Sequence, residues 1–329
     1  MSFVLNRAKL QWRRYAIKRQ SPNRKIIAIG QIMQLGDIAA SEPIARYVRQ
    51  QYPDSYIIWC VKRTFRELID YNPFINETLV VTCISEWMRL METALFDEVL
   101  DLHIQGLACH VCRNPLMKKQ AGNPQITFNN YYNVASLLKV YCLSAGLPVL
   151  QEQPKVYIPQ AVIRSVNRHR LHERFVVIHC TSNAGMRDWT KSKWEDLVER
   201  IANTWGLPVV EVGLRPVADK VASHVYTNLC GRLSILETAE VIRRARLFVG
   251  IDSGPAHLAN AVGTFGIILL GHFWGFRHYM PYCGNYSDTS KAILIYEDGP
   301  VAEITVDRVF AAVADAIQRH ELGESCRVI

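Results

Sequence analysis

Acidic residues are missing from the start of this chain. Although its 329 residues include 30 Asp and Glu, the first of them is Asp37. The first 25 residues instead carry eight basic side chains, which account for the whole net charge of +8. The rest of the chain is charge-balanced, so any attraction to an anionic surface should lie in this N-terminal arm, residues 1–25. The eight basic residues are Arg7, Lys9, Arg13, Arg14, Lys18, Arg19, Arg24 and Lys25.

Long apolar runs and a regular cysteine framework are missing too. No run approaches the ~18 residues that a membrane-spanning helix needs, and the first residues lack the apolar stretch of a signal peptide. The nine cysteines are an odd number and are scattered, which is typical of reduced thiols in a cytoplasmic protein. With 49% hydrophobic residues and this length, we expect a cytoplasmic protein of two globular domains.

The N-terminal arm has two interpretations. A helix there would place Arg7, Arg14 and Lys18 on one face and an apolar set on another. Such a basic amphipathic helix suits an anionic membrane surface, with residues 1–24 as the contact. Alternatively, the helix is solvated and packs on its own domain through Trp12 and Tyr15. No nucleic-acid-binding module accompanies the arm, so no nucleic-acid partner is expected. The apolar set is Leu5, Ala8, Trp12 and Tyr15.

Short apolar strands alternate with helical segments along the chain. Such alternation favours parallel sheets with right-handed crossovers, so the sequence predicts two α/β units with a cleft between them. Residues 147–160 hold three prolines and mark the linker. Strands are predicted at 26–30, 56–61, 78–82, 98–103, 175–180, 208–213, 247–251 and 266–271. Helices are predicted at about 37–51, 131–145, 190–204, 234–246, 254–262 and 306–321.

The segment FVGIDSGPAHLANAVGT places an aspartate, a glycine without a side chain and a histidine where a strand meets a helix. Asp252 ends the apolar run, and ligands of open α/β sheets collect at such carboxyl ends. Pro255 suits the first turn of a helix whose N-cap is Ser253 or Gly254. Free N–H groups, the helix dipole and a glycine favour a bound phosphate, which His257 could also reach. The alternative is an ordinary capped helix with a buried histidine.

This segment, residues 248–264, resembles the nucleotide-binding signature of glycosyltransferase family 9, the ADP-heptose:lipopolysaccharide heptosyltransferases. The resemblance implies a GT-B fold, in which two Rossmann-like domains with parallel sheets face each other across a cleft. It also implies a metal-independent enzyme, and the sequence contains no D-x-D motif. Further segments that resemble the family are residues 31–61, 71–81, 97–106, 179–201 and 228–250.

By this resemblance, Asp37 matches the aspartate proposed as the catalytic base. A competing interpretation makes Asp37 the N-cap of the following helix. No cofactor is implied beyond the donor substrate. Lys191 and Lys193 are nearby alternatives to Arg187 as the cation against the diphosphate. The residues that match the family's donor nucleotide site are Thr181, Ser182, Arg187, Asp252, Ser253, Gly254 and His257.

Two further groups are open to interpretation. Lys62, Arg63 and Arg113 follow predicted strands of the first domain and could bind an acidic acceptor, or they are ordinary surface cations. The C-x-x-C of Cys109 and Cys112, with His103 upstream, is weak support for a metal, because a second such pair is missing. Reduced thiols are the preferred interpretation, and no metal is expected.

The predicted function is an inverting, metal-independent transfer of a heptose, or a related sugar, from a nucleotide-diphosphate donor, ADP-heptose. The predicted acceptor is the anionic glycolipid of the lipopolysaccharide core, at the inner face of a bacterial inner membrane. One alternative is a protein O-heptosyltransferase acting on an adhesin, and another is a nucleotide-binding GT-B protein without transfer activity. The domains are expected at residues 1–25 (arm), 26–155 (acceptor), 156–305 (donor) and 306–329 (a helix packing back toward the first domain).

Overall fold

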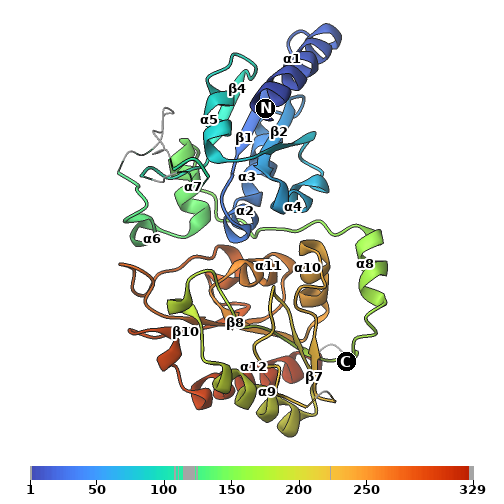
Figure 1. Ribbon diagram of the computed structural model, residues 1–329, viewed down its shortest axis with the longest axis vertical. Coiled ribbons are helices and arrows are strands. Elements are labelled where there is room, and N and C mark those ends of the chain that lie inside the picture. Colours follow the sequence, from blue (N-terminus) through green and yellow to red (C-terminus); the bar gives the residue numbers. More distant parts are fainter. Residues whose placement is uncertain are drawn as a thin grey trace. The chain divides into compact units, whose positions relative to one another are not determined.

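A computed structural model describes residues 2–106, 109, 111–113, 123, 125–222 and 224–325, the last six of them by their backbone alone. The chain divides into two compact units, Met1–Tyr157 and Ile158–Ile329. Each unit is built on a parallel sheet with helices packed against it (Figure 1). The prediction of two parallel-sheet α/β units is therefore confirmed. The division falls within residues 147–160, the predicted linker.

The sheet of the first unit has the strand order β3-β2-β1-β4, and all of its pairings are parallel. Its centre is β1, in which all five residues are buried. Since β1 lies between β2 and β4, the strand order reverses there, and the loops that follow β1 and β4 emerge at the position where open sheets bind ligands. The strands are β1 (Ile26–Gly30), β2 (Tyr56–Lys62), β3 (Glu77–Val81) and β4 (Glu98–Asp101).

Two predicted helices of the first unit are each divided in two. The predicted helix 37–51 breaks at Ser41, because Pro43 has no N–H group to continue the hydrogen-bond ladder. The predicted helix 131–145 breaks at Ala135, whose backbone is extended. The helices are α1 (Ser2–Gln20), α2 (Leu35–Ala40), α3 (Glu42–Gln51), α4 (Glu67–Asp70), α5 (Ile84–Met91), α6 (Tyr131–Val134) and α7 (Leu137–Ala145), with the short 3-10 helix η1 (Arg63–Phe65).

Helix α1 packs on α5 and β3 of its own unit. The buried side chains on α1 are Leu10 and Ile17. Trp12 and Tyr15, by contrast, are 65% and 64% exposed. The prediction that these two aromatic residues pack the helix against the domain is therefore wrong. A regular helix places them on the face opposite Leu10 and Ile17.

Most of the basic residues of α1 form ion pairs with acidic residues of the same unit. Lys9 and Arg13 lie 2.7 and 2.9 Å from the carboxylate of Glu77. Arg14 and Lys18 each lie 2.8 Å from the carboxylate of Asp97. Four cations of the arm thus share two carboxylates of the unit on which it packs.

The sheet of the second unit has the order β10-β9-β8-β5-β6-β7, and all of its pairings are parallel. The order reverses between β5 and β8, which sets the place for a ligand. The sequence analysis did not predict β7 or β10, which are edge strands and only partly buried; β7 also has only three residues. The strands are β5 (Val176–His179), β6 (Val209–Glu211), β7 (Tyr226–Asn228), β8 (Leu247–Ile251), β9 (Gly266–Leu270) and β10 (Ala292–Tyr296).

The helices of the second unit cover its sheet. Helix α12 packs on α9, as Figure 1 also shows, with Val309 and Val313 in the core. A contact of this last helix with the first unit stays a prediction. The helices are α8 (Gln160–Asn167), α9 (Lys191–Trp205), α10 (Ile235–Arg244), α11 (Gly254–Val262) and α12 (Val306–Ser325), with the 3-10 helices η2 (Gly185–Arg187), η3 (Gly284–Tyr286) and η4 (Val301–Glu303). None of the helices in the described parts of the chain is both long and apolar enough to span a bilayer.

Candidate functional site

Asp252 is the centre of a buried polar group at the carboxyl end of β8. It is 2% exposed and accepts hydrogen bonds from the hydroxyl groups of Tyr279, at 2.9 Å, and Tyr282, at 3.1 Å. The guanidinium of Arg187 lies 3.1 Å from the same carboxylate. A buried carboxylate is costly unless it is paired and hydrogen-bonded. These three donors therefore satisfy the carboxylate of Asp252 and fix it between two loops and the start of α11.

Ser253 and His179 join the ends of the two strands that flank the switch point. Ser253 is the N-cap of α11, and it is one of the two residues that the sequence predicted for this position. Its hydroxyl lies 2.9 Å from Nδ1 of His179, and the two share a hydrogen bond. Burial lowers the pKa of His179 to about 4, so the imidazole is neutral at pH 7. The hydroxyl of Ser253 makes no capping bond, so it leaves the first N–H groups of α11 without a side-chain cap.

Gly254 and His257 lie in the first turn of α11. Gly254 is the first helical residue, so the backbone there carries no side chain to hold back an anion. His257 is 5% exposed, and its ring centroid lies 4.7 Å from that of Tyr282. The structure thus brings His257 into the same aromatic surroundings as Asp252. A contact between His257 and a phosphate stays a prediction.

The loop after β5 carries the other predicted donor residues. Ser182 stabilises the loop itself, since its N–H and hydroxyl lie 2.7 and 2.8 Å from the carboxylate of Asp188. Thr181 is partly buried beside it. Arg187 reaches out of this loop to Asp252, donates to Asn183 at 2.9 Å, and lies 4.3 Å from the ring centroid of Phe273. Arg187 is therefore brought to the signature segment.

Lys191 and Lys193 are directed elsewhere. The ammonium of Lys191 pairs with Asp219 and lies 3.7 Å from Glu195. The ammonium of Lys193 donates to the carbonyl oxygens of Ala302 and Ile304 at 2.6 and 2.9 Å. Of the three cations suggested for the diphosphate, the structure places Arg187 beside Asp252.

Asp37 occupies the loop and helix that follow β1 in the first unit. It is the third residue of α2, whose N-cap is Gln34, so the interpretation of Asp37 as the N-cap is wrong. Its carboxylate nevertheless accepts a hydrogen bond of 2.9 Å from the backbone N–H of Gln34. The hydroxyl of Tyr141 also donates to it. A small pocket reaches Asp37 between Tyr141 and Tyr131.

Burial raises the pKa of Tyr141 well above its usual value of 10, and the nearby charge of Asp37 adds to this effect. The phenol therefore keeps its proton and remains a hydrogen-bond donor at every physiological pH. Because Tyr141 comes from α7, this bond fixes the start of α2 against a distant part of the unit.

His103 supports the loop that leads to Asp37. Its Nε2 accepts a hydrogen bond of 3.1 Å from the backbone N–H of Ile32, and its Nδ1 lies 2.5 Å from Asp101. Trp87 donates to the same carboxylate at 3.1 Å. His103 is thus used in a buried network between β4 and the loop after β1, and does not belong to a metal site with Cys109.

The candidate acceptor residues differ in position. Lys62 ends β2, and burial lowers its pKa, while Asp37, Cys109 and Cys83 act in the opposite direction. Lys62 is thereby within electrostatic range of Asp37. Arg63 begins the 3-10 helix η1. The backbone of Arg113 is left-handed, with φ 56°, and follows Cys112.

The sequence did not identify four residues of these two groups: His179, Tyr141, Tyr279 and Tyr282. His179 ends a buried strand, so the rule that singled out Asp252 could have found it. Tyr279 and Tyr282 belong to residues 271–285, where aromatic residues are dense. Tyr141 carries no local signal, since only the packing of α7 brings it to Asp37.

Two parallel-sheet units, each with polar side chains at its topological switch point, define a two-domain protein of the nucleotide-binding α/β class. The sequence model of glycosyltransferase family 9 (heptosyltransferase) matches residues 131–273. Over these residues the chain resembles this family, and it is a glycosyltransferase with a GT-B fold.

Individual relatives agree with this assignment. Lipopolysaccharide heptosyltransferase 3 of Escherichia coli is 22% identical over 284 residues, which span 72% of this chain and 80% of that protein. A family 9 glycosyltransferase from Veillonella parvula matches the structure with a TM-score of 0.69 at 18% identity, over 90% of this chain and 97% of that one. ADP-heptose lps heptosyltransferase II of E. coli matches with a TM-score of 0.66 at 17% identity, over 90% and 99%.

Proposed function

We propose that the protein transfers a heptose from ADP-heptose to the lipopolysaccharide core, with inversion at the anomeric carbon and without a metal ion. The names of the relatives support the sugar and the acceptor. The observation that carries the proposal is the placement of Asp37 and of the Asp252 group, each at the ligand-binding edge of its own sheet.

The second unit would hold the donor. The N-terminus of α11 offers uncapped N–H groups and the positive end of the helix dipole to the diphosphate. Arg187 supplies the cation and is oriented by Asp252 and Phe273. Neutral His179 fixes Ser253 without adding charge. In a metal-independent transfer, these groups stabilise the charge that develops on the departing diphosphate.

The first unit would activate the acceptor. As the acceptor oxygen bonds to the anomeric carbon, the bond from that carbon to the diphosphate oxygen breaks. The proton of the acceptor hydroxyl passes to the carboxylate of Asp37, and the diphosphate leaves with the bonding electrons. Gln34 and Tyr141 hold that carboxylate in one orientation, which a general base requires. Lys62, near the same edge, could bind a phosphate of the acceptor.

A transfer assay tests this function. Purified protein is incubated with ADP-heptose, or with ADP-, GDP- or UDP-hexoses, and with a heptose-deficient lipopolysaccharide core or an adhesin fragment. Mass spectrometry should detect one added heptose on the core, and NMR should give the anomer opposite to that of the donor. Transfer only to serine residues of the adhesin would replace the lipid acceptor by a protein. Transfer only from another nucleotide sugar would overturn the donor assignment.

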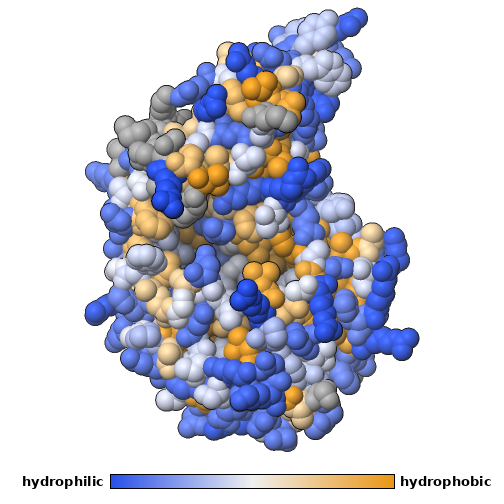
Figure 2. Space-filling view, in the orientation of Figure 1, coloured by the Kyte–Doolittle hydropathy of each residue, from blue (hydrophilic) through white to orange (hydrophobic). Residues whose placement is uncertain are grey.

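We further propose that α1 attaches the enzyme to an anionic membrane, in agreement with a glycolipid acceptor. The attachment differs from a purely basic contact, because four of the basic residues pair with Glu77 and Asp97. The exposed surface of α1 also carries apolar and aromatic side chains among its polar ones, and side chains such as Trp and Tyr prefer the membrane interface. In Figure 2 the surface over α1 mixes strongly hydrophilic residues with paler ones. The exposed side chains are Val4, Leu5, Trp12 and Tyr15.

Two further cations lie on α1. Arg7 and Arg19 have no acidic partner among the described residues. Each cation near an acidic leaflet contributes about 1 kcal/mol to the attraction. Together with the exposed apolar side chains, they fit a bilayer that contains anionic lipids.

A further inference from the structure

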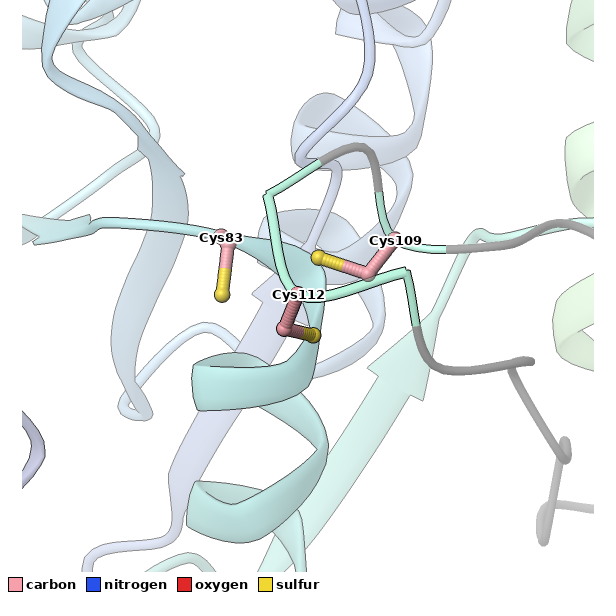
Figure 3. A group of neighbouring side chains, drawn as sticks. All are labelled: Cys83, Cys109 and Cys112. Atoms are coloured by element: carbon pink, nitrogen blue, oxygen red, sulfur yellow. The ribbon is translucent and has the colours of Figure 1, made fainter.

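Three cysteines converge at the carboxyl edge of the first sheet. Cys83 lies between β3 and α5, as the N-cap of that helix. Cys109 and Cys112 come from one loop, and Figure 3 shows their side chains beside Cys83 at the start of the helix. The three sulfur atoms all lie within 4.8 Å of one another, and all three are free thiols. The sequence suggested the pair but could not reveal Cys83, which is distant along the chain.

The loop turns around the sulfur of Cys109. The backbone N–H groups of Val111 and Cys112 donate to this sulfur, as does that of Ser85 at the start of α5. The N–H of Arg113 donates to the carbonyl oxygen of Cys109 at 2.6 Å, in a left-handed conformation that closes the turn.

Ordinary packing does not account for this arrangement. Cys112 is exposed, and its sulfur lies 2.7 Å from the hydroxyl of Ser85 rather than in the apolar core. A redox pair would need two thiols, whereas three meet here. In a tetrahedral zinc site with Zn–S bonds of about 2.3 Å, the sulfurs lie about 3.8 Å apart. The three thiols therefore need to approach by about 1 Å at most.

We propose that Cys83, Cys109 and Cys112 bind a thiophilic divalent cation, zinc. Soft thiolate ligands select such metals over magnesium or calcium. Each thiol loses its proton on binding, so occupancy releases up to three protons to solvent. Among the described residues, no fourth His, Cys or carboxylate belongs to the group, so a water molecule would complete the coordination.

Such a metal would fasten the loop around Cys109 to the start of α5. That loop follows β4, which flanks the strand order reversal where Asp37 also lies. The charge of Lys62 is within range of Asp37, Cys83 and Cys109. The metal would therefore stabilise the acceptor edge of the first unit without taking part in sugar transfer. This inference does not depend on the identity of the sugar or the acceptor.

Metal content tests the proposal directly. The full-length protein is purified under reducing conditions, loaded with zinc or cobalt, desalted and measured by mass spectrometry of metals. We expect one metal per chain and a cobalt spectrum with thiolate charge-transfer bands of about three sulfurs. Loss of outer-shell partners alone weakens metal sites by 10–100-fold. Cys112→Ser and Cys83→Ser should therefore weaken zinc binding by more than ~100-fold, whereas Cys230→Ser, at a buried thiol of the second unit, should not.

Several results would overturn the proposal. These are a reduced wild-type protein that binds no stoichiometric metal, equal binding by Cys112→Ser and wild type, or a Cys109–Cys112 disulfide as the native form. Because Cys112 is exposed, its substitution should leave the fold intact, which circular dichroism checks. The cobalt spectrum of the wild type counts the thiolates without any variant. In addition, a chelator should lower the melting temperature of the wild type but not that of Cys112→Ser.

Discussion

Tyr141 donates a hydrogen bond from its hydroxyl to the carboxylate of Asp37, across 104 residues of sequence. The bond leaves Asp37 held by two donors, this phenol and the N–H of Gln34. A carboxylate fixed in this way has one orientation for taking a proton. The bond from Gln34 is the N3 half of a capping box at the start of α2. The same carboxylate therefore supports the helix start and is, by our proposal, the general base.

The substitution Asp37→Asn distinguishes a catalytic role of the carboxylate from a role in stabilising the fold. The amide oxygen can still accept from Gln34, so the melting temperature and the donor affinity should change little. Loss of the base should lower kcat by ~10²–10⁴. The measurement is steady-state transfer at saturating donor and acceptor. Turnover near that of the wild type would remove Asp37 from the catalytic role.

Tyr141→Phe provides the matched control. It removes one hydrogen bond to the carboxylate but keeps the carboxylate itself. We expect a much smaller loss of kcat, about tenfold, because orientation and not the base is affected. If Tyr141→Phe were as inactive as Asp37→Asn, the effect of both substitutions would be structural.

Donor affinity should depend on Arg187 and not on Lys191. Arg187 lies beside Asp252 at the predicted diphosphate site, whereas Lys191 is exposed and pairs with Asp219. Hydrogen bonds to charged groups contribute about 1.5–3 kcal/mol. Arg187→Ala should therefore raise the Kd for the nucleotide sugar by roughly 10–150-fold.

Lys191→Ala should leave the same Kd within about twofold, because its ammonium is held outside this group. His257→Ala is expected to weaken binding in the same range as Arg187→Ala, about 10–150-fold. Titration calorimetry measures all three variants. Equal affinity of Arg187→Ala and wild type would place the diphosphate elsewhere, and a loss confined to Lys191→Ala would reverse the assignment.

The sequence predicted those parts of the site that depend on local pattern. Asp252 and Ser253 could be located because an apolar strand runs into Gly254 and Pro255, which together mark a helix start. Asp37 was singled out by the resemblance of residues 31–61 to the family, and it lies in the segment that follows the first buried strand. In each case the signal lies within a few residues of the functional group.

Groups that form only through tertiary packing could not be predicted. Tyr141 reaches Asp37 from α7. Cys83 precedes β4 in the chain, yet it lies beside the C-x-x-C loop that follows β4. Lys191 lies near Arg187 in the sequence, but the fold pairs its ammonium with Asp219. Likewise, the periodicity of α1 indicated two faces without revealing which one packs.

Membrane attachment through α1 should depend on its aromatic face. Trp12→Ser together with Tyr15→Ser removes two exposed side chains, so the fold should persist. Burial of one large apolar side chain contributes about 1.5–3 kcal/mol, so binding to vesicles that contain anionic phospholipid should fall at least ~10-fold. Vesicle co-sedimentation measures this binding, and Lys9→Gln, at a paired residue, is the matched control.

Deletion of residues 1–24 would be a poor substitute for this test. It removes the buried Leu10 and Ile17 and the ion pairs with Glu77 and Asp97, so it should destabilise the first unit. Unchanged vesicle binding of the aromatic double variant would contradict the proposed attachment. Dimerisation that this double substitution abolishes would assign the face to a second copy of the chain instead.

The buried imidazole of His179 should make the stability of the protein depend on pH. Burial lowers the pKa of this histidine to about 4 in the folded protein, against about 6.5 in an unfolded chain. Between these values the unfolded chain binds the proton and the folded protein does not, so stability falls as the pH drops from 6.5 toward 4. Above pH 6.5 the imidazole is neutral in both states. Compared with pH below 4, this group then adds about 3 kcal/mol to the free energy of unfolding.

His179→Asn removes the titrating group while an amide can still bond to Ser253. The melting temperature of the variant should therefore fall less than that of the wild type between pH 7.5 and pH 4.5, because other acids titrate equally in both proteins. Differential scanning calorimetry of the two proteins across this range measures the difference. Parallel curves would mean that His179 is not buried as a neutral imidazole, and that Ser253 is held at the start of α11 by another partner.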